Sequence, residues 1–144
     1  MIYLDSCVLV KLIRAEAESE ALQAWLDERP DELLVTSELA HAEVLRVVRR
    51  NNHTDQGALI DAAQLTTDLA EAAFVLDGLQ HITVDRELLE RAGAVEAPML
   101  RTLDAIHLVS ALELAKLDPE VVTYDRRLAE IARTAGLRAV APGT

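Results

Sequence analysis

Four acidic side chains occupy positions from which a folded chain could bring them together. Asp5 and Asp125 each follow a short apolar segment directly, whereas Glu43 and Asp104 lie within segments of helical spacing. Several carboxylates in one crevice repel one another unless they are protonated or bridged by a cation. Oxygen ligands without Cys or clustered His suit Mg²⁺ or Mn²⁺ better than Zn²⁺. The sequence therefore indicates a divalent-metal site of the kind that serves phosphoryl transfer.

Several of these acids also have an ordinary structural explanation. Asp5, Asp85 and Asp125 each stand between an apolar segment and a helix-like segment, where Asp is a preferred helix N-cap. Asp104 falls in the first turn of a predicted helix, where the helix dipole favours an acid. The pattern alone leaves open which acids are caps and which are ligands.

Glu43 is harder to explain as a surface acid. It shares one face of its predicted helix with Leu39, Ala40 and Val47. A glutamate on a face that packs against the core is costly unless it is paired or bound to a cation. An ion pair with one of the arginines that follow on the same helix is the alternative explanation.

Strands and helices alternate along the chain, which predicts a mostly parallel α/β sheet. Fully apolar strands such as the first fit the middle of a parallel sheet, and ligands bind outside the carboxyl ends of such strands. We expect Thr36 and Ser37 to cap the helix that carries Glu43, Thr102 to cap the helix that carries Asp104, and 93–101 to be a loop. The predicted strands are 2–4, 33–35, 82–84, 121–124 and an edge strand at 137–140; the predicted helices are 7–14, 19–28, 38–50, 86–92, 103–116 and 126–135, with one or two more in 55–79, broken near Thr66 and Thr67.

Composition limits the classes of protein to which the chain can belong. We expect the 144 residues to form one domain, and the net charge of −11 argues against a protein that coats nucleic acid by bulk electrostatics. The net charge still allows a nucleic-acid enzyme with a local basic patch. Cys7 is the only cysteine, which predicts a reducing cytoplasm and a small core residue at that position. No apolar run reaches the length that spans a bilayer, so we expect no membrane association.

Other catalytic motifs are absent from the sequence. Neither glycine-rich phosphate-binding pattern is present, and the four histidines lack metal-ligand spacing. His107 lies one turn past Asp104 and could face the same site, but we expect a structural histidine there. A basic edge beside the Glu43 position is formed by Arg46, Arg49, Arg50 and His53. A solvated helix end and contact with a nucleic-acid backbone explain it equally well.

Four longer segments occur together and cover the chain almost end to end: IYLDSCVLVKL, ELAHAEVLRVVRR, LRTLDAIHLVSALEL and VTYDRRLAEIA. With this set, the chain resembles the PIN-domain ribonucleases and, within them, the VapC toxins of bacterial toxin–antitoxin pairs. The resemblance implies a five-stranded parallel sheet of order 3-2-1-4-5 with helices on both sides. It also implies a metal site carried over to Asp5, Glu43, Asp104 and Asp125.

The resemblance also assigns supporting positions. Ser6 stands where family members use a hydroxyl to help hold the first Asp, whereas Cys7 stands where Ser, Thr or Asn is commoner. Asp85 lies in a segment that family members do not use for metal. The implied activity is Mg²⁺- or Mn²⁺-assisted hydrolysis of structured RNA such as tRNA or rRNA.

The implied partners are RNA and a VapB-like antitoxin, and we expect a homodimer and a toxin–antitoxin hetero-oligomer. The residues expected to hold RNA phosphates are Arg46, Arg49 and Arg126. An antitoxin segment is expected to dock on the early helices, at Leu22, Trp25 and Leu26, because Trp is enriched among interface anchors.

Two other functions remain compatible with acids at strand ends. A phosphoacceptor domain of the receiver type would want paired early acids and a late lysine, whereas Ser6 and Cys7 follow Asp5 and an arginine follows Asp125. A catalytically silent binding module is the second alternative, and the complete acid set disfavours it.

Overall fold

Parallel strand pairing organises the chain around its first strand. The computed structural model describes residues 1–144. All neighbouring strands pair in parallel, in the order β3-β2-β1-β4-β5, which confirms the predicted topology. The strands are β1 (Ile2–Leu4), β2 (Leu34–Ser37), β3 (Gln80–Ile82), β4 (Glu120–Val122) and β5 (Arg138–Val140).

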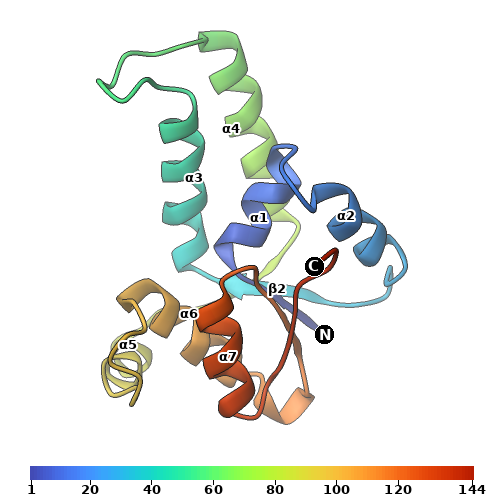
Figure 1. Ribbon diagram of the computed structural model, residues 1–144, viewed down its shortest axis with the longest axis vertical. Coiled ribbons are helices and arrows are strands. Elements are labelled where there is room, and N and C mark those ends of the chain that lie inside the picture. Colours follow the sequence, from blue (N-terminus) through green and yellow to red (C-terminus); the bar gives the residue numbers. More distant parts are fainter.

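Helices cover both faces of this sheet (Figure 1). Ile2 and Leu4 of β1 pack into one core cluster with residues of α1 to α4, whereas Tyr3 packs into a second cluster with residues of α6 and α7. This division follows from the alternation of side chains along a strand. The helices are α1 (Ser6–Ile13), α2 (Ser19–Asp27), α3 (Leu39–Asn51), α4 (Ala62–Asp77), α5 (Arg86–Gly93), α6 (Thr102–Leu112) and α7 (Arg126–Thr134), with a 3₁₀ turn η1 (Ala115–Leu117).

The helices α3 and α4 run side by side away from the sheet as an arm (Figure 1). A buried polar contact joins them: the Asn52 side-chain amide donates to the Asp68 carboxylate at 2.8 Å. Gln64 donates to the other oxygen of the same carboxylate at 2.6 Å. The contact fixes the arm near the end that carries the α3–α4 connection.

The segment 55–79 holds one helix, and the predicted break near Thr66 and Thr67 is wrong. Both hydroxyls donate to backbone carbonyls one turn earlier, so neither residue interrupts α4. Asp61 caps that helix by accepting from two backbone amides.

Two capping predictions also need correction. Thr36 and Ser37 belong to β2, and the Thr36 hydroxyl donates to the Leu4 carbonyl of the neighbouring strand. Ser37 still accepts the Leu39 amide at 3.3 Å. Thr102 is the first residue of α6 and makes no side-chain cap.

Other boundaries shift by a few residues. β3 lies two residues earlier than predicted, because the Glu38 side chain, not a strand neighbour, accepts the Val84 amide. The helix α6 ends at Leu112 instead of residue 116, and a 3₁₀ turn follows. None of the helices combines the length and the apolar character needed to cross a bilayer.

Candidate metal centre

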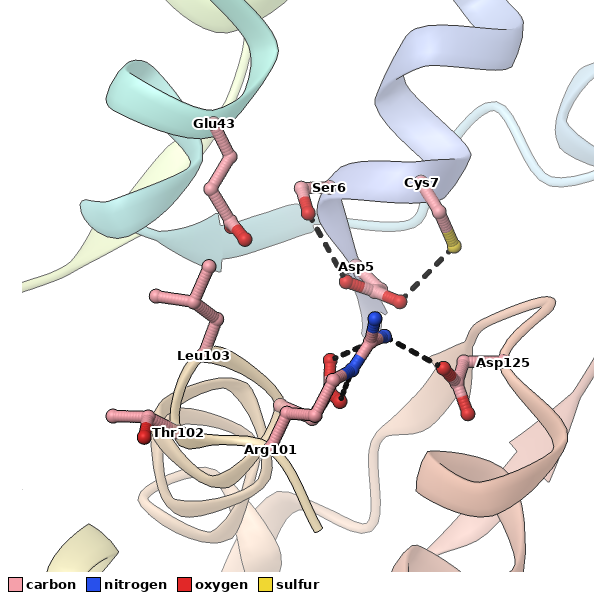
Figure 2. A pocket seen from close by; sticks show the side chains of 9 residues that line it. Asp5, Ser6, Cys7, Glu43, Arg101, Thr102, Leu103 and Asp125 are labelled. Carbon is pink, nitrogen blue, oxygen red and sulfur yellow. Dashed lines mark hydrogen bonds and ion pairs between the residues drawn. The ribbon is translucent and has the colours of Figure 1, made fainter. Parts of the chain in front are cut away.

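The carboxyl ends of β1 and β4 meet the helices α3 and α6 around one cavity of about 250 Å³. Its lining includes all four predicted acids: Asp5, Glu43, Asp104 and Asp125. Figure 2 labels Asp5, Glu43 and Asp125 on the wall of this cavity. The register pairs Leu4 with Val122, so the residues that follow the two strands emerge side by side. The fold thus brings together acids that lie up to 120 residues apart in sequence.

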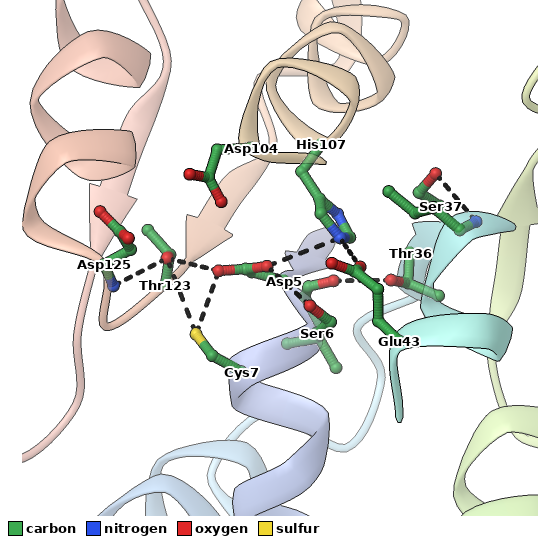
Figure 3. Close-up of polar contacts among 12 residues, drawn as sticks. Asp5, Ser6, Cys7, Thr36, Ser37, Glu43, Asp104, His107, Thr123 and Asp125 are labelled. Atoms are coloured by element: carbon green, nitrogen blue, oxygen red, sulfur yellow. Dashed lines mark hydrogen bonds and ion pairs between the residues drawn. The ribbon is translucent and has the colours of Figure 1, made fainter. Parts of the chain in front are cut away.

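Asp5 is held by hydroxyl and thiol groups instead of capping a helix. It is buried, and its carboxylate accepts no backbone amide of α1. The Thr123 hydroxyl donates to Oδ2 at 2.7 Å, and the Cys7 thiol lies 3.0 Å from the same oxygen (Figure 3). The predicted support from Ser6 is a longer contact of 3.4 Å to Oδ1. Thr123, which sequence reasoning missed, makes the shorter hydroxyl bond.

Cys7 is half-buried: it packs against the apolar core, as expected, and also lies on the wall of the cavity. Burial, and then the charge of Asp5, raise the pKa of the Cys7 thiol to about 12. A thiol that stays protonated near neutral pH is a poor nucleophile. Cys7 is therefore a neighbour of Asp5 and not a nucleophile in its own right.

His107 connects the acids to the core of the protein. The ring is buried, with Nε2 at 2.7 Å from Glu43 Oε2 and 3.6 Å from Asp5 Oδ1 (Figure 3). Nδ1 is hydrogen-bonded to the buried Tyr3 hydroxyl at 2.8 Å. Burial alone would lower the pKa of His107, but the Glu43 hydrogen bond and the surrounding acidic charges outweigh it and raise that pKa. His107 is thus a satisfied structural histidine, as predicted, and also a direct neighbour of two site acids.

Glu43 pairs with His107 and not with an arginine of its own helix. The face that it shares with Leu39 and Val47 is half-buried and lines a cavity, whereas Ala40 is fully buried in the core. The helix face that was expected to pack against the core is therefore divided: Ala40 packs in the core, and Leu39, Glu43 and Val47 face the cavity.

Arg101 bridges two of the acids (Figure 2). Its Nε donates to Asp104 Oδ2 at 2.8 Å, and Nη2 donates to Asp125 Oδ2 at 3.1 Å. The hydrogen bond with Asp104 is the main cause of a raised pKa of Arg101. The guanidinium side chain is 70% exposed, so it can move away from the cavity without opening the core.

The two remaining strand-end acids differ in role. Asp85 accepts the Leu88 amide at 2.8 Å, caps α5 and lies outside the cavity. Asp125 also caps a helix, because its Oδ1 accepts the amides of Arg127 and Leu128. Its other oxygen faces Arg101, so Asp125 is a cap and a cavity acid together.

The donor chemistry of the cavity fits a hard divalent cation, because four carboxylates face one guanidinium. In the present arrangement no three His, Cys, Asp or Glu side chains lie close enough together to hold a metal ion. The Arg101 guanidinium lies between two of the donors. Arg101 must therefore move before Asp104 and Asp125 can bind a metal ion together.

The arginines predicted to bind RNA occupy different surroundings. Arg46 lines a groove beside the acid cavity, as does Arg50. Arg49 is exposed but lines neither of these cavities, and Arg126 is exposed at the start of α7.

The residues predicted to dock a partner are only partly available. Leu22 is completely buried in the core, so it offers no surface, and that expectation is wrong. Trp25 is half-buried, with the Arg29 guanidinium 4.1 Å from the centre of its ring. Leu26 lines a groove between α2 and α4, together with the exposed Phe74.

Known proteins match this chain over almost its whole length. The sequence pattern of the PIN domain matches residues 2–134. Ribonuclease VapC35 of Mycobacterium tuberculosis is 39% identical over 145 residues, which cover 99% of this chain and 98% of the relative. The chain therefore belongs to the PIN domain family and, within it, to the VapC ribonucleases of toxin–antitoxin systems.

Solved structures with lower identity have the same fold. Mycobacterium tuberculosis VapC20, described as a sarcin–ricin loop cleaving toxin, superposes with a TM-score of 0.69 at 17% identity, covering 99% of this chain and 100% of that one. VapBC2 from Rickettsia felis, bound to a DNA fragment from its promoter, gives 0.68 at 15% identity and covers 99% of both chains.

Proposed function

We propose that this chain is a metal-dependent endoribonuclease toxin that cleaves structured RNA, such as tRNA or rRNA, and is neutralised by a cognate antitoxin. The observation that carries the proposal is the convergence of four acids from four segments on one cavity. The ribonuclease relatives support it, since nucleases of the PIN family are generally metal-dependent.

Asp5, Glu43, Asp104 and Asp125 are proposed to hold one or two Mg²⁺ or Mn²⁺ ions. When bound, such an ion supplies Lewis-acid neutralisation of phosphate charge and activation of water. The protein's own contribution is to fix the donors. Thr123 orients Asp5 through its hydroxyl, and the buried His107 orients Glu43. Both bonds aim carboxylate oxygens into the cavity before any ligand arrives.

RNA phosphates are proposed to contact arginines around the cavity. Arg46 and Arg126 are exposed, and neither has an ion-pair partner in the structure. Both are therefore free to contact an anionic backbone. Contact of Arg49 with RNA stays a prediction, because Arg49 lines neither cavity.

The antitoxin is proposed to dock across the groove between α2 and α4. Leu26 and Phe74 give the groove apolar walls, and Phe74 is 76% exposed. Asp27, Glu71 and Asp77 make its rim acidic, which suits a basic amphipathic segment. The homodimer and the cytoplasmic location stay predictions, and sedimentation of the purified chain, alone and with the antitoxin, tests the first.

Cleavage of total cellular RNA with and without EDTA tests the function. We expect new RNA ends only with Mg²⁺ or Mn²⁺, and none with the Asp5→Ala variant. Asp85→Ala is the matched control, because it also removes an aspartate carboxylate, but from a helix cap outside the cavity. The proposal is wrong if RNA is cleaved as well in EDTA as with Mg²⁺ or Mn²⁺, or if Asp5→Ala is as active as the wild type.

The receiver-type alternative disagrees with the topology. Receiver domains have strand order 2-1-3-4-5, whereas this sheet has order 3-2-1-4-5. A silent binding module would bind no metal in a calorimetric titration with Mn²⁺, whereas the proposed enzyme is expected to bind it.

A further inference from the structure

A second cavity of about 400 Å³ adjoins the acid cavity and lies between α1 and α3. Ser6, Cys7, Glu43 and Leu103 line both cavities, so the groove begins where the acids end. Cleavage at the acid cavity would leave the neighbouring part of the substrate within reach of this groove.

The walls of the groove are mainly aliphatic. One face of α3 contributes Leu39, Ala42 and Val47 at helical spacing, and Val10 of α1 and Leu103 of α6 add to the wall. Ala42 and Leu103 are exposed, so part of this apolar surface faces solvent. Such a lining suits a flat, weakly polar group.

Positive charge flanks this apolar wall. Arg46 and Arg50 line the groove, and neither pairs with a carboxylate, although the chain has 25 acidic residues. Arg14 donates to the Asn51 carbonyl at 3.5 Å, which places a third guanidinium beside the end of α3. Unpaired arginines in a chain of net charge −11 mark a local site for an anion.

We propose that this groove is a nucleotide subsite of the ribonuclease, an inference that rests on the proposed function. The base of the nucleotide next to the scissile phosphate lies among Leu39, Val47 and Val10, and the phosphate beyond it is held by Arg46 and Arg50. Bases pack against apolar side chains and stack on guanidinium planes, and arginine binds phosphate through paired donors.

The charge of the groove favours a nucleotide over the segment expected of an antitoxin. Arg46 and Arg50 line the groove, and two guanidinium groups repel a basic segment but attract a phosphate.

Nucleotide binding to the metal-free, full-length protein tests the subsite. The probes are the 5′- and 3′-monophosphates of the four nucleosides, with ribose 5-phosphate and inorganic phosphate as references, titrated in EDTA. Methyl resonances of Val10 and Val47 report on occupancy. We expect at least one nucleotide to bind roughly fivefold tighter than ribose 5-phosphate, the gain expected when the base and the aliphatic wall remove about 40 Å² of apolar surface from water.

Two pairs of variants separate the base from the phosphate. Ala42→Leu fills the groove from an exposed position of α3, so the protein should no longer bind a nucleotide more tightly than ribose 5-phosphate. Ala73→Leu makes the same change at an exposed position of α4 and should leave this difference in affinity unchanged. Arg50→Gln should weaken all phosphate-containing probes, whereas Arg86→Gln removes the same charge from α5 and should change nothing.

The possible outcomes distinguish this subsite from the function on which it rests. Metal-dependent RNA cleavage without any nucleotide preference overturns the subsite and leaves the ribonuclease function standing. Absence of cleavage overturns the function and, with it, the role of the groove. Methyl shifts that appear only with the co-expressed antitoxin would assign the groove to a protein partner and overturn the subsite.

Discussion

At the scale of single residues, Arg101 acts as an internal counter-ion of the candidate site. It bonds Asp104 and Asp125 at 2.8 and 3.1 Å, so these carboxylates can serve a metal ion only after the guanidinium leaves. We expect Arg101→Gln to lower the metal-free melting temperature, because the acids lose their counter-charge. The same change should tighten Mn²⁺ binding by roughly two- to tenfold, because the metal ion no longer competes with the Arg101 guanidinium for Asp104 and Asp125.

Calorimetric scans in EDTA and Mn²⁺ titrations measure both effects. Arg127→Gln is the control, because it removes the same charge from a side chain that donates to the Met99 carbonyl and touches no carboxylate. If Arg127→Gln tightens Mn²⁺ binding as much as Arg101→Gln does, the loss of one positive charge explains the effect. The contact of Arg101 with Asp104 and Asp125 would then not be its cause.

A histidine pair makes stability depend on pH. His81 stacks on His41 with ring centres 4.6 Å apart, and His81 Nε2 has no hydrogen-bond partner. Burial, and then the charge of His41, lower the pKa of His81, although Glu38 and Asp77 oppose the shift. A lowered folded-state pKa gives stability that is present above about pH 6.5 and is lost as the pH falls.

We therefore expect the wild type to lose more stability than His81→Asn between about pH 7.5 and about pH 5. Urea unfolding of both proteins at the two pH values measures the difference, and the other titrating groups cancel in the comparison. Equal losses would mean that the stacked pair does not resist protonation.

The sequence predicted which acids converge but not what holds them. The pattern marked Asp5, Asp85 and Asp125 alike as acids after strands, and the resemblance to PIN-domain ribonucleases selected Asp5, Glu43, Asp104 and Asp125. Thr123 lies in a predicted strand, and its bond to Asp5 depends on which strand is the neighbour. Arg101 precedes Asp104 by three residues, a spacing that permits an ion pair, but its second bond crosses to another helix.

At the scale of elements, a buried polar contact fixes the arm formed by α3 and α4. Asn52 and Asp68 are 3% and 6% exposed, and the Asn52 amide also donates to the Val48 carbonyl. We expect Asn52→Leu to lower the free energy of unfolding by about 1–3 kcal/mol, because Asp68 loses a buried donor.

The double variant Asn52→Leu/Asp68→Leu should lose less than this single variant, since it leaves no unpaired carboxylate in the core. The Gln64 amide also loses its acceptor, but Gln64 is exposed and can bond to water. Denaturant unfolding of the two singles and the double gives the coupling energy. A double variant less stable than either single would show that the contact is not the source of the loss.

Element boundaries were predictable only where local signals and tertiary pairing agree. The central strand and the helices that follow it were placed nearly correctly from apolar pattern and spacing. β3 moved because a side chain of the α3 N-terminus accepts the amide where the strand was expected to continue. Thr66 and Thr67 suggested a break, but their hydroxyls bond within the helix that they occupy.

At the scale of the whole molecule, an acidic chain must bind an acidic substrate. The net charge of −11 repels RNA at long range, and this repulsion is screened by salt. We propose that a few exposed arginines around the cavity supply the attraction, since Arg46, Arg50 and Arg126 lack carboxylate partners. On this proposal, the strength of RNA binding depends on a small number of phosphate contacts.

This leads to a quantitative prediction for RNA binding by the Asp5→Ala variant, which should leave the RNA intact. Three phosphate contacts give a slope of log affinity against log salt between about −2 and −3, because each contact contributes about −0.7 on a single strand and about −0.9 on a duplex. Arg126→Gln should reduce the slope by roughly 0.7–0.9, whereas Arg86→Gln, on α5, should leave it unchanged. Fluorescence anisotropy of a labelled RNA across a salt series measures all three proteins. A much steeper slope, or one that responds equally to both arginine changes, would mean that RNA binds over a wider surface than the arginines around the acid cavity.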